Sequence, residues 1–165
     1  MPRRVFFSFH YDADNWRASQ VRNIGAVDGN PAASDNDWES VTRGGDAAIK
    51  RWIAGQMYGR TCAVVLIGAN TANRKWINFE ISESWNQGLG VVGIHVHRLK
   101  DRNQQQSAKG LNPFDYVSFT KSGAALSSVI PTHDPPFWDS RDVYGHIGAN
   151  IADWIEEAVA LRAVY

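Results

Sequence analysis

Short apolar runs alternate with amphipathic stretches along this chain. Such an alternation is typical of βαβ units, in which helices bury parallel strands on both faces. The strands that it predicts are Arg4 to Phe9, a short one around Ile24 to Val27, Thr61 to Ile67, Val91 to Val96 and a less apolar one from Tyr116 to Phe119. The pattern therefore indicates an α/β fold with a mostly parallel sheet of about five strands flanked by helices.

Four stretches between and after these runs repeat their apolar residues at helical spacing. Capping residues help to place the ends, because Asp is a common N-cap and Gly a common helix stop. The predicted helices run from Asp14, as the N-cap, to about Asn23, from Asp46 to Gly59, from about Arg74 to Gln87 and from about Val143 to Arg162. Each has one apolar face, which should pack on the sheet.

Three further stretches show neither pattern and are expected to be irregular. They are Asp28 to Gly45, His97 to Pro113 and Pro131 to Ser140, which are rich in turn-forming and polar residues. Connections as long as the first two are more often functional than idle in a compact domain.

The composition is that of a neutral protein with enough apolar residues for one core. Seventeen basic and seventeen acidic residues cancel, which removes the general electrostatic case for binding nucleic acid or an anionic membrane. The first apolar run is too short for a signal peptide, and no run reaches the roughly 18 residues of a membrane helix. The single cysteine, Cys62, lies in an apolar run and is expected to be a buried thiol. We therefore expect one cytoplasmic domain over residues 1–165.

Candidate chemistry lies just beyond the predicted strands, where open parallel sheets bind their ligands. The first strand leads into Ser8 to Asp12, and the Thr61 to Ile67 strand leads into a helix on which Trp76, Glu80 and Glu83 form one stripe. Glu80 is close to the start of this helix, so its carboxylate could face a ligand. The alternative is an ordinary solvated glutamate beside a Trp76 that covers the sheet edge, and spacing alone favours that interpretation.

Three parts of the chain resemble one known family. They are Arg4 to Tyr11 (RVFFSFHY), Val65 to Gly68 with Asn73 to Ile81 (NRKWINFEI), and Val92 to His95 with Asn112 to Tyr116 (NPFDY). Together they resemble the first strand and loop, the catalytic-glutamate segment, and a later strand and loop of the TIR-like proteins (ThsB family) of bacterial Thoeris antiphage systems. The resemblance extends from about Arg3 to Tyr116 and fades beyond it.

This resemblance implies a flavodoxin-like TIR fold and an enzyme that cleaves NAD+ at the nicotinamide bond. The product would be a cyclic ADP-ribose type signal that activates a separate effector, and copies of the chain could form a homo-oligomer. NAD+ would be the substrate, with no cofactor and no metal. Glu80 maps onto the catalytic glutamate of the family. The substrate-binding residues that it implies or that flank the expected pocket are Ser8, Phe9, Tyr11, Trp76 and Asp37.

The chemistry of NAD+ cleavage suits a lone carboxylate. Nicotinamide is a positively charged pyridinium in NAD+ and leaves as a neutral amide, so no general acid is needed. A single glutamate could hold the ribose hydroxyls and stabilise the positive charge that develops on the sugar. Phe9 or Trp76 could stack on a base and exclude water.

Other interpretations use the same residues differently. A TIR-like module that signals only by assembly would leave Glu80 a surface charge, and a nucleoside deoxyribosyltransferase would use the glutamate on another N-glycosidic bond. Gly88 to Gly93 matches GxGxxG, but it follows a helix and precedes a strand, the reverse of a dinucleotide fingerprint. His95 and His97 share one strand face without further ligands at metal spacing, so we expect structural histidines.

Overall fold

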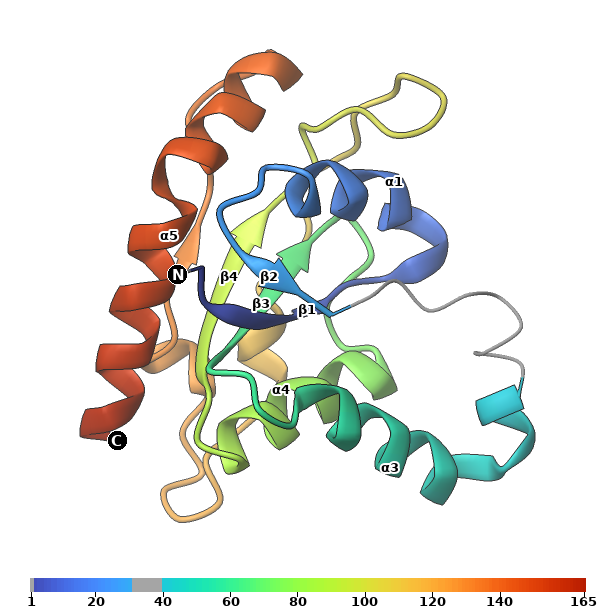
Figure 1. Ribbon diagram of the computed structural model, residues 1–165, viewed down its shortest axis with the longest axis vertical. Coiled ribbons are helices and arrows are strands. Elements are labelled where there is room, and N and C mark those ends of the chain that lie inside the picture. Colours follow the sequence, from blue (N-terminus) through green and yellow to red (C-terminus); the bar gives the residue numbers. More distant parts are fainter. Residues whose placement is uncertain (1, 31–39) are drawn as a thin grey trace.

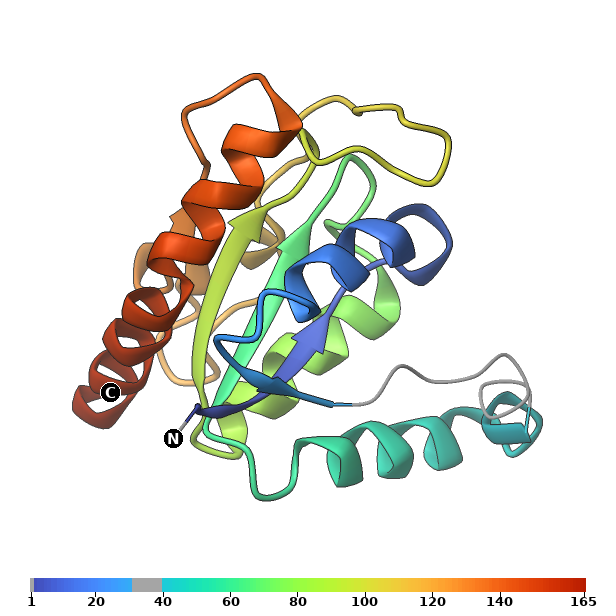
Figure 2. The same ribbon diagram turned by 45° about the horizontal axis from the view of Figure 1, so that its top comes forward.

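The sheet is five-stranded and entirely parallel in the computed structural model, which describes residues 2–30 and 40–165. Every pair of neighbouring strands runs in the same direction, and the arrowheads of β1, β3 and β4 point toward the same edge in Figure 2. In spatial order the strands are β2 (Asp28–Gly29), β1 (Arg4–Ser8), β3 (Cys62–Ile67), β4 (Gly90–His95) and β5 (Thr132–His133). The predicted α/β fold with a parallel sheet is confirmed.

Helices cover both faces of this sheet (Figure 1). On one face α1 (Tyr11–Arg22) and α5 (Ser140–Val164) bury their apolar residues against the strands. On the other face α3 (Gly45–Met57) and α4 (Lys75–Asn86) do the same. Every residue of β3 and β4 is buried, which is why these two strands form continuous apolar runs in the sequence.

The first helix begins earlier than its sequence indicates. His10 is the N-cap of α1, because its Nδ1 accepts a hydrogen bond from the Ala13 amide at 3.0 Å. The prediction that Asp14 caps this helix is wrong. Asp14 is instead buried inside α1, where its Oδ1 accepts a hydrogen bond from Arg17 Nη1 at 2.9 Å. Similarly, α5 begins at Ser140 because Asp139 caps it.

The weakest strand predictions are also corrected by the structure. The strand expected around Ile24 to Val27 lies slightly later, at β2. The chain from 113 to 128 forms two 3-10 helices, η1 (Pro113–Tyr116) and η2 (Leu126–Ser128), and the expected strand from Tyr116 to Phe119 contributes only an isolated antiparallel bridge. The fifth strand of the sheet is β5, which lies in the stretch expected to be irregular.

A side-chain and backbone network joins the loops at the carboxyl edge of the sheet. Arg17 is almost completely buried beside Asp14, and its guanidinium also donates to the backbone carbonyls of Leu99 and Gln105, at 2.7 and 2.9 Å. A β-carbon on Gly68 would collide with the Asp14 carboxylate, and one on Gly110 would collide with the Gly68 carbonyl. The loops after β3 and β4 are therefore held against the first turns of α1.

One property of the helices bears on the membrane expectation. Within residues 2–30 and 40–165, none of the helices combines the length and the apolar character that a membrane span requires.

Candidate active site

The helix that carries Glu80 starts from a tight turn after β3. The Gly68 amide donates to Thr71 Oγ1 at 2.8 Å, and Asn73 adopts a positive φ of 58°, which Asn tolerates better than most residues. Arg74 is the N-cap, and α4 then runs back across the sheet with Ile77 and Ile81 buried. Glu80 lies beside this buried stripe, so its side chain is directed toward the edge of the interface between helix and sheet.

The Glu80 carboxyl group lies in an apolar environment. The residue as a whole keeps part of its surface in solvent, yet burial of the carboxyl raises its pKa from an ordinary 4.5 to about 8. A fully solvated carboxyl, as in the alternative of a simple surface charge, would keep an ordinary pKa. In the free protein at neutral pH the carboxyl is therefore largely protonated.

Ser8 is the polar neighbour of this carboxyl. Its hydroxyl lies close enough to lower the Glu80 pKa by hydrogen bonding, the single interaction that opposes the effect of burial. The residue is 1% exposed, and Ser8 Oγ has no other partner among the described residues and no hydrogen bond of full geometry. The contact is thus a loose one, in which a buried hydroxyl faces a buried carboxyl across the junction of β1 and α4.

Phe9 and Tyr11 lie differently from Ser8. Because side chains alternate along a strand, Phe9 follows Phe7 onto the face covered by α1 and α5. Its ring centroid is 6.4 Å from that of Tyr11, and the Arg22 guanidinium lies 5.3 Å from it. The structure therefore brings Ser8 to Glu80 and pairs the two aromatic rings with each other. Contact of either ring with a ligand stays a prediction.

Trp76 is on the first turn of α4. It is partly buried against the core cluster that includes Ile77 and Ile81 of the same helix. Its ring makes an edge-to-face contact with Phe79, with centroids 6.0 Å apart, and Lys75 Nζ lies 4.9 Å from the ring centroid. A ligand base would have to replace this lysine to stack on that ring face. Asp37 lies outside the described residues, so its expected role in substrate binding stays a prediction.

The two histidines at the end of β4 lie side by side in the interior. The rings of His95 and His97 are 5.8 Å apart and both residues are buried, and burial lowers the pKa of His95 to about 4. Among residues 2–30 and 40–165 no three or more His, Cys, Asp or Glu side chains are grouped so that they could hold a metal ion. The Cys62 thiol is also fully buried, and burial raises its pKa to about 12.

One feature of this region was missed from the sequence although the sequence contains a signal for it. The buried pair of Asp14 and Arg17 has the i, i+3 spacing of a helical ion pair. Strand alternation explains why Ser8 faces α4. Side chains alternate between the two faces of β1, so Ser8 lies on the same face as Phe6 and on the face opposite to Phe7. Periodicity indicates which face a residue occupies, but not which helix residue it meets there.

The five-stranded parallel sheet with helices on both faces is consistent with a TIR-like α/β domain. The family comparison agrees, because the model of the TIR-like domain of Thoeris protein ThsB matches residues 6–101, more than half of the chain. The chain therefore belongs to the Thoeris ThsB family.

One curated relative extends the match beyond that domain model. It is named "Putative cyclic ADP-D-ribose synthase ThsB1" and comes from Bacillus cereus (strain MSX-D12). The two proteins are 39% identical over 127 residues, which cover 74% of this chain and 66% of the relative.

Proposed function

We propose that this chain is an antiphage-defence enzyme that cleaves NAD+ between nicotinamide and ribose and forms a cyclic ADP-ribose type product. The observation that carries the proposal is the buried Glu80 carboxyl on α4, faced by the Ser8 hydroxyl, in a member of the ThsB family. The name of the B. cereus relative, a cyclic ADP-D-ribose synthase, supports this choice of reaction.

The raised pKa of Glu80 suits a cationic substrate. A carboxyl with a pKa of about 8 is mostly neutral in the empty site. A pyridinium ring placed nearby favours the ionised form, because an opposite charge within a few ångströms lowers the pKa of a carboxyl. The Ser8 hydroxyl would favour ionisation further by donating to the carboxylate. Binding of NAD+ would therefore generate the charged form of Glu80 that the reaction needs.

Cleavage breaks the bond between the nicotinamide nitrogen and C1′ of the ribose. The bonding electron pair goes to the ring nitrogen, so the leaving nicotinamide is neutral and the sugar gains oxocarbenium character. The Glu80 carboxylate would stabilise this charge, an interaction that strengthens toward the transition state. A nucleophilic group within the same ADP-ribose would then bond to C1′ and lose its proton, which closes the cyclic product.

The remaining parts of the proposal concern partners. A diffusible product requires a separate effector that binds it, and we propose such an effector for this chain. A homo-oligomer formed by copies of this chain is also part of the proposal. The reaction as written uses no cofactor besides the substrate.

The direct test compares the wild-type chain with Glu80→Gln and Glu83→Gln in cells infected with phage and as purified proteins. Glu83 lies one turn further along α4, where its Oε1 accepts from Gln87 at the surface, so it is a matched control. We expect nicotinamide release and a cyclic ADP-ribose isomer, measured by mass spectrometry, from the wild type and Glu83→Gln. Glu80→Gln should remain folded but give neither nicotinamide nor the cyclic product. Full turnover by Glu80→Gln would refute the catalytic assignment.

A parallel incubation separates the enzyme classes. The purified chain is given a deoxynucleoside in place of NAD+, and release of the free base is followed. Base release from the deoxynucleoside alone would indicate deoxyribosyl transfer. To test the messenger, a protein-free filtrate from infected cells is added to the effector, and activation only by the intact chain would favour a module that signals by contact.

A further inference from the structure

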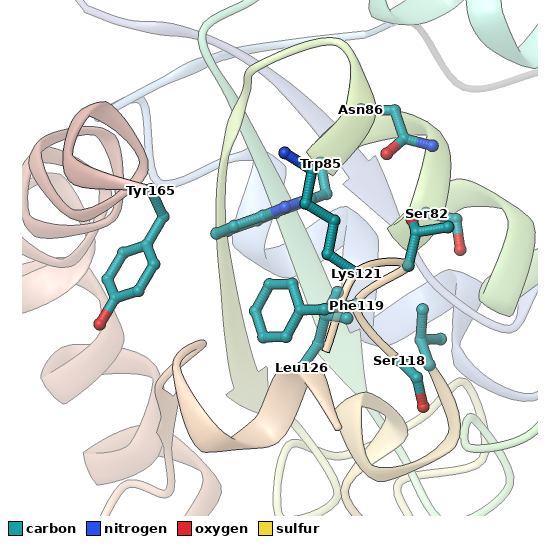
Figure 3. Close-up of a pocket in the computed structure, with 10 residues that line it drawn as sticks. Ser82, Trp85, Asn86, Ser118, Phe119, Lys121, Leu126 and Tyr165 are labelled. Atoms are coloured by element: carbon teal, nitrogen blue, oxygen red, sulfur yellow. The ribbon is translucent and has the colours of Figure 1, made fainter. Parts of the chain in front are cut away.

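A cavity of about 300 Å3 lies at the far end of α4 from its N-terminus (Figure 3). One wall is the last turn of α4, with Ser82 and Trp85, and a second wall is the segment after η1, with Phe119 and Lys121. Tyr165 approaches from the end of α5 on the other side. Ser8, Trp76 and Glu80 do not line this cavity, so it is separate from the candidate active site.

The floor of the cavity is apolar and aromatic. The rings of Trp85 and Phe119 meet edge to face with centroids 5.4 Å apart, and Leu126 beneath them is 2% exposed. Arg162 fixes the tryptophan, because its guanidinium lies 4.4 Å from the ring centroid and donates two hydrogen bonds to the Trp85 carbonyl. The aromatic surface is therefore held in place before any ligand binds, which lowers the entropic cost of binding.

The rim of the cavity carries polar groups that have no protein partner. Within the described residues, no hydrogen bond or ion pair involves the side chains of Ser82, Ser118, Thr120 or Lys121. Lys121 is the one charged side chain among the described residues that line the cavity, and none of those side chains is acidic. A cavity with one free ammonium group and several free hydroxyls is electrostatically suited to an anion that also accepts and donates hydrogen bonds.

We propose that this cavity binds an anionic ligand with a planar aromatic ring, of about the size of a mononucleotide. The ring would contact Trp85 and Phe119, a phosphate would pair with Lys121, and the free hydroxyls would bind sugar or base atoms. The volume is at the lower end of the range for ligand pockets, which favours a mononucleotide over a dinucleotide such as NAD+. The proposal does not depend on the reaction at Glu80.

Titration of the full chain with AMP, followed by two-dimensional NMR, tests the proposal. We expect saturable shifts of the Trp85 indole signal and of the backbone amides from 117 to 121. Adenosine, which lacks the phosphate, and inorganic phosphate, which lacks the ring, should each bind more weakly than AMP. Lys121→Glu should weaken AMP binding about tenfold or more, the loss expected when one charge-assisted hydrogen bond is replaced by repulsion.

Two controls decide the outcome. Lys100→Glu makes the same charge change on a loop at the opposite edge of the sheet and should leave AMP binding at the Trp85 signal unchanged. A Lys121→Gln variant, which removes the charge without reversing it, should give an intermediate loss. The proposal is overturned if AMP causes no saturable shift at Trp85, if the shifts occur only at Ser8 and Glu80, or if Lys121→Glu binds AMP as tightly as the wild type.

Discussion

The unusual pKa of Glu80 makes the stability of the protein depend on pH in a direction that can be worked out from the site. Burial raises the pKa of the folded state to about 8, whereas the unfolded chain has the ordinary value of 4.5. The folded state thus binds this proton more tightly. The stabilising effect of the proton on Glu80 is fully present below pH 4.5, declines between pH 4.5 and 8, and is lost above pH 8.

The magnitude follows from the same two values. The gap between 4.5 and about 8 corresponds to at most about 5 kcal/mol, at about 1.4 kcal/mol for each pH unit. Because the residue keeps part of its surface in water, we expect solvent to reduce this to about 1 to 3 kcal/mol. Glu80→Gln keeps a neutral amide of similar shape at every pH. The free energy of unfolding of the variant, relative to that of the wild type, should therefore rise by about 1 to 3 kcal/mol as the pH rises from 5 to 9.

Urea unfolding at pH 5, 7 and 9 measures this difference, since other titrating groups affect wild type and variant alike. Glu83→Gln, which removes a surface carboxylate from the same helix, is the matched control. A Glu80→Gln difference that does not grow with pH would refute the placement of the carboxyl in an apolar environment. Unfolding of the variant at every pH would instead show that the carboxyl is required for the fold.

Three further changes test other parts of the structure. Ser8→Ala should move the acid limb of NAD+ cleavage to higher pH by removing the donor to the catalytic carboxylate, and Ser8→Thr should restore it, as pH-rate profiles would show. Arg17→Met should cost about 3 to 5 kcal/mol in urea unfolding, because it leaves Asp14 buried without a partner. His95, with its pKa lowered to about 4, should make the wild type lose stability as pH falls from 6.5 toward 4, and His95→Gln should lose less.

The central elements could be predicted because their patterns have one local cause. Burial on both faces makes β3 and β4 continuous apolar runs, and the stop at Gly88 has a positive φ of 86° that favours glycine. The expected strand from Tyr116 to Phe119 was wrong for an instructive reason. Its apolar residues pack against the core although they do not form a strand. Val117 is 7% exposed, and Phe119 contacts the end of α4. A short apolar run therefore predicts that the residues are buried, but it does not predict their backbone conformation.

The candidate site depended on information that is not local. Asp14 is a residue type that often caps a helix, but here its carboxylate accepts from Arg17. Arg17 in turn donates to the carbonyls of Leu99 and Gln105, which are more than eighty residues away in the chain. The meeting of Ser8 with Glu80 likewise depends on how α4 crosses the sheet. Family resemblance selected both residues before the structure placed them together, whereas spacing alone favoured a solvated glutamate.

The sign of the pH dependence separates the two N-glycosidic reactions that a glutamate in this position could perform. A deoxynucleoside has a neutral base, which leaves easily only when a group donates a proton to it. Where Glu80 supplies that proton, cleavage requires its neutral form, which burial favours. Such cleavage would decline as pH rises through about 8. Cleavage of NAD+ needs the carboxylate and no acid, so its kcat/KM should rise with pH over the same range, and a decline would contradict the proposed mechanism.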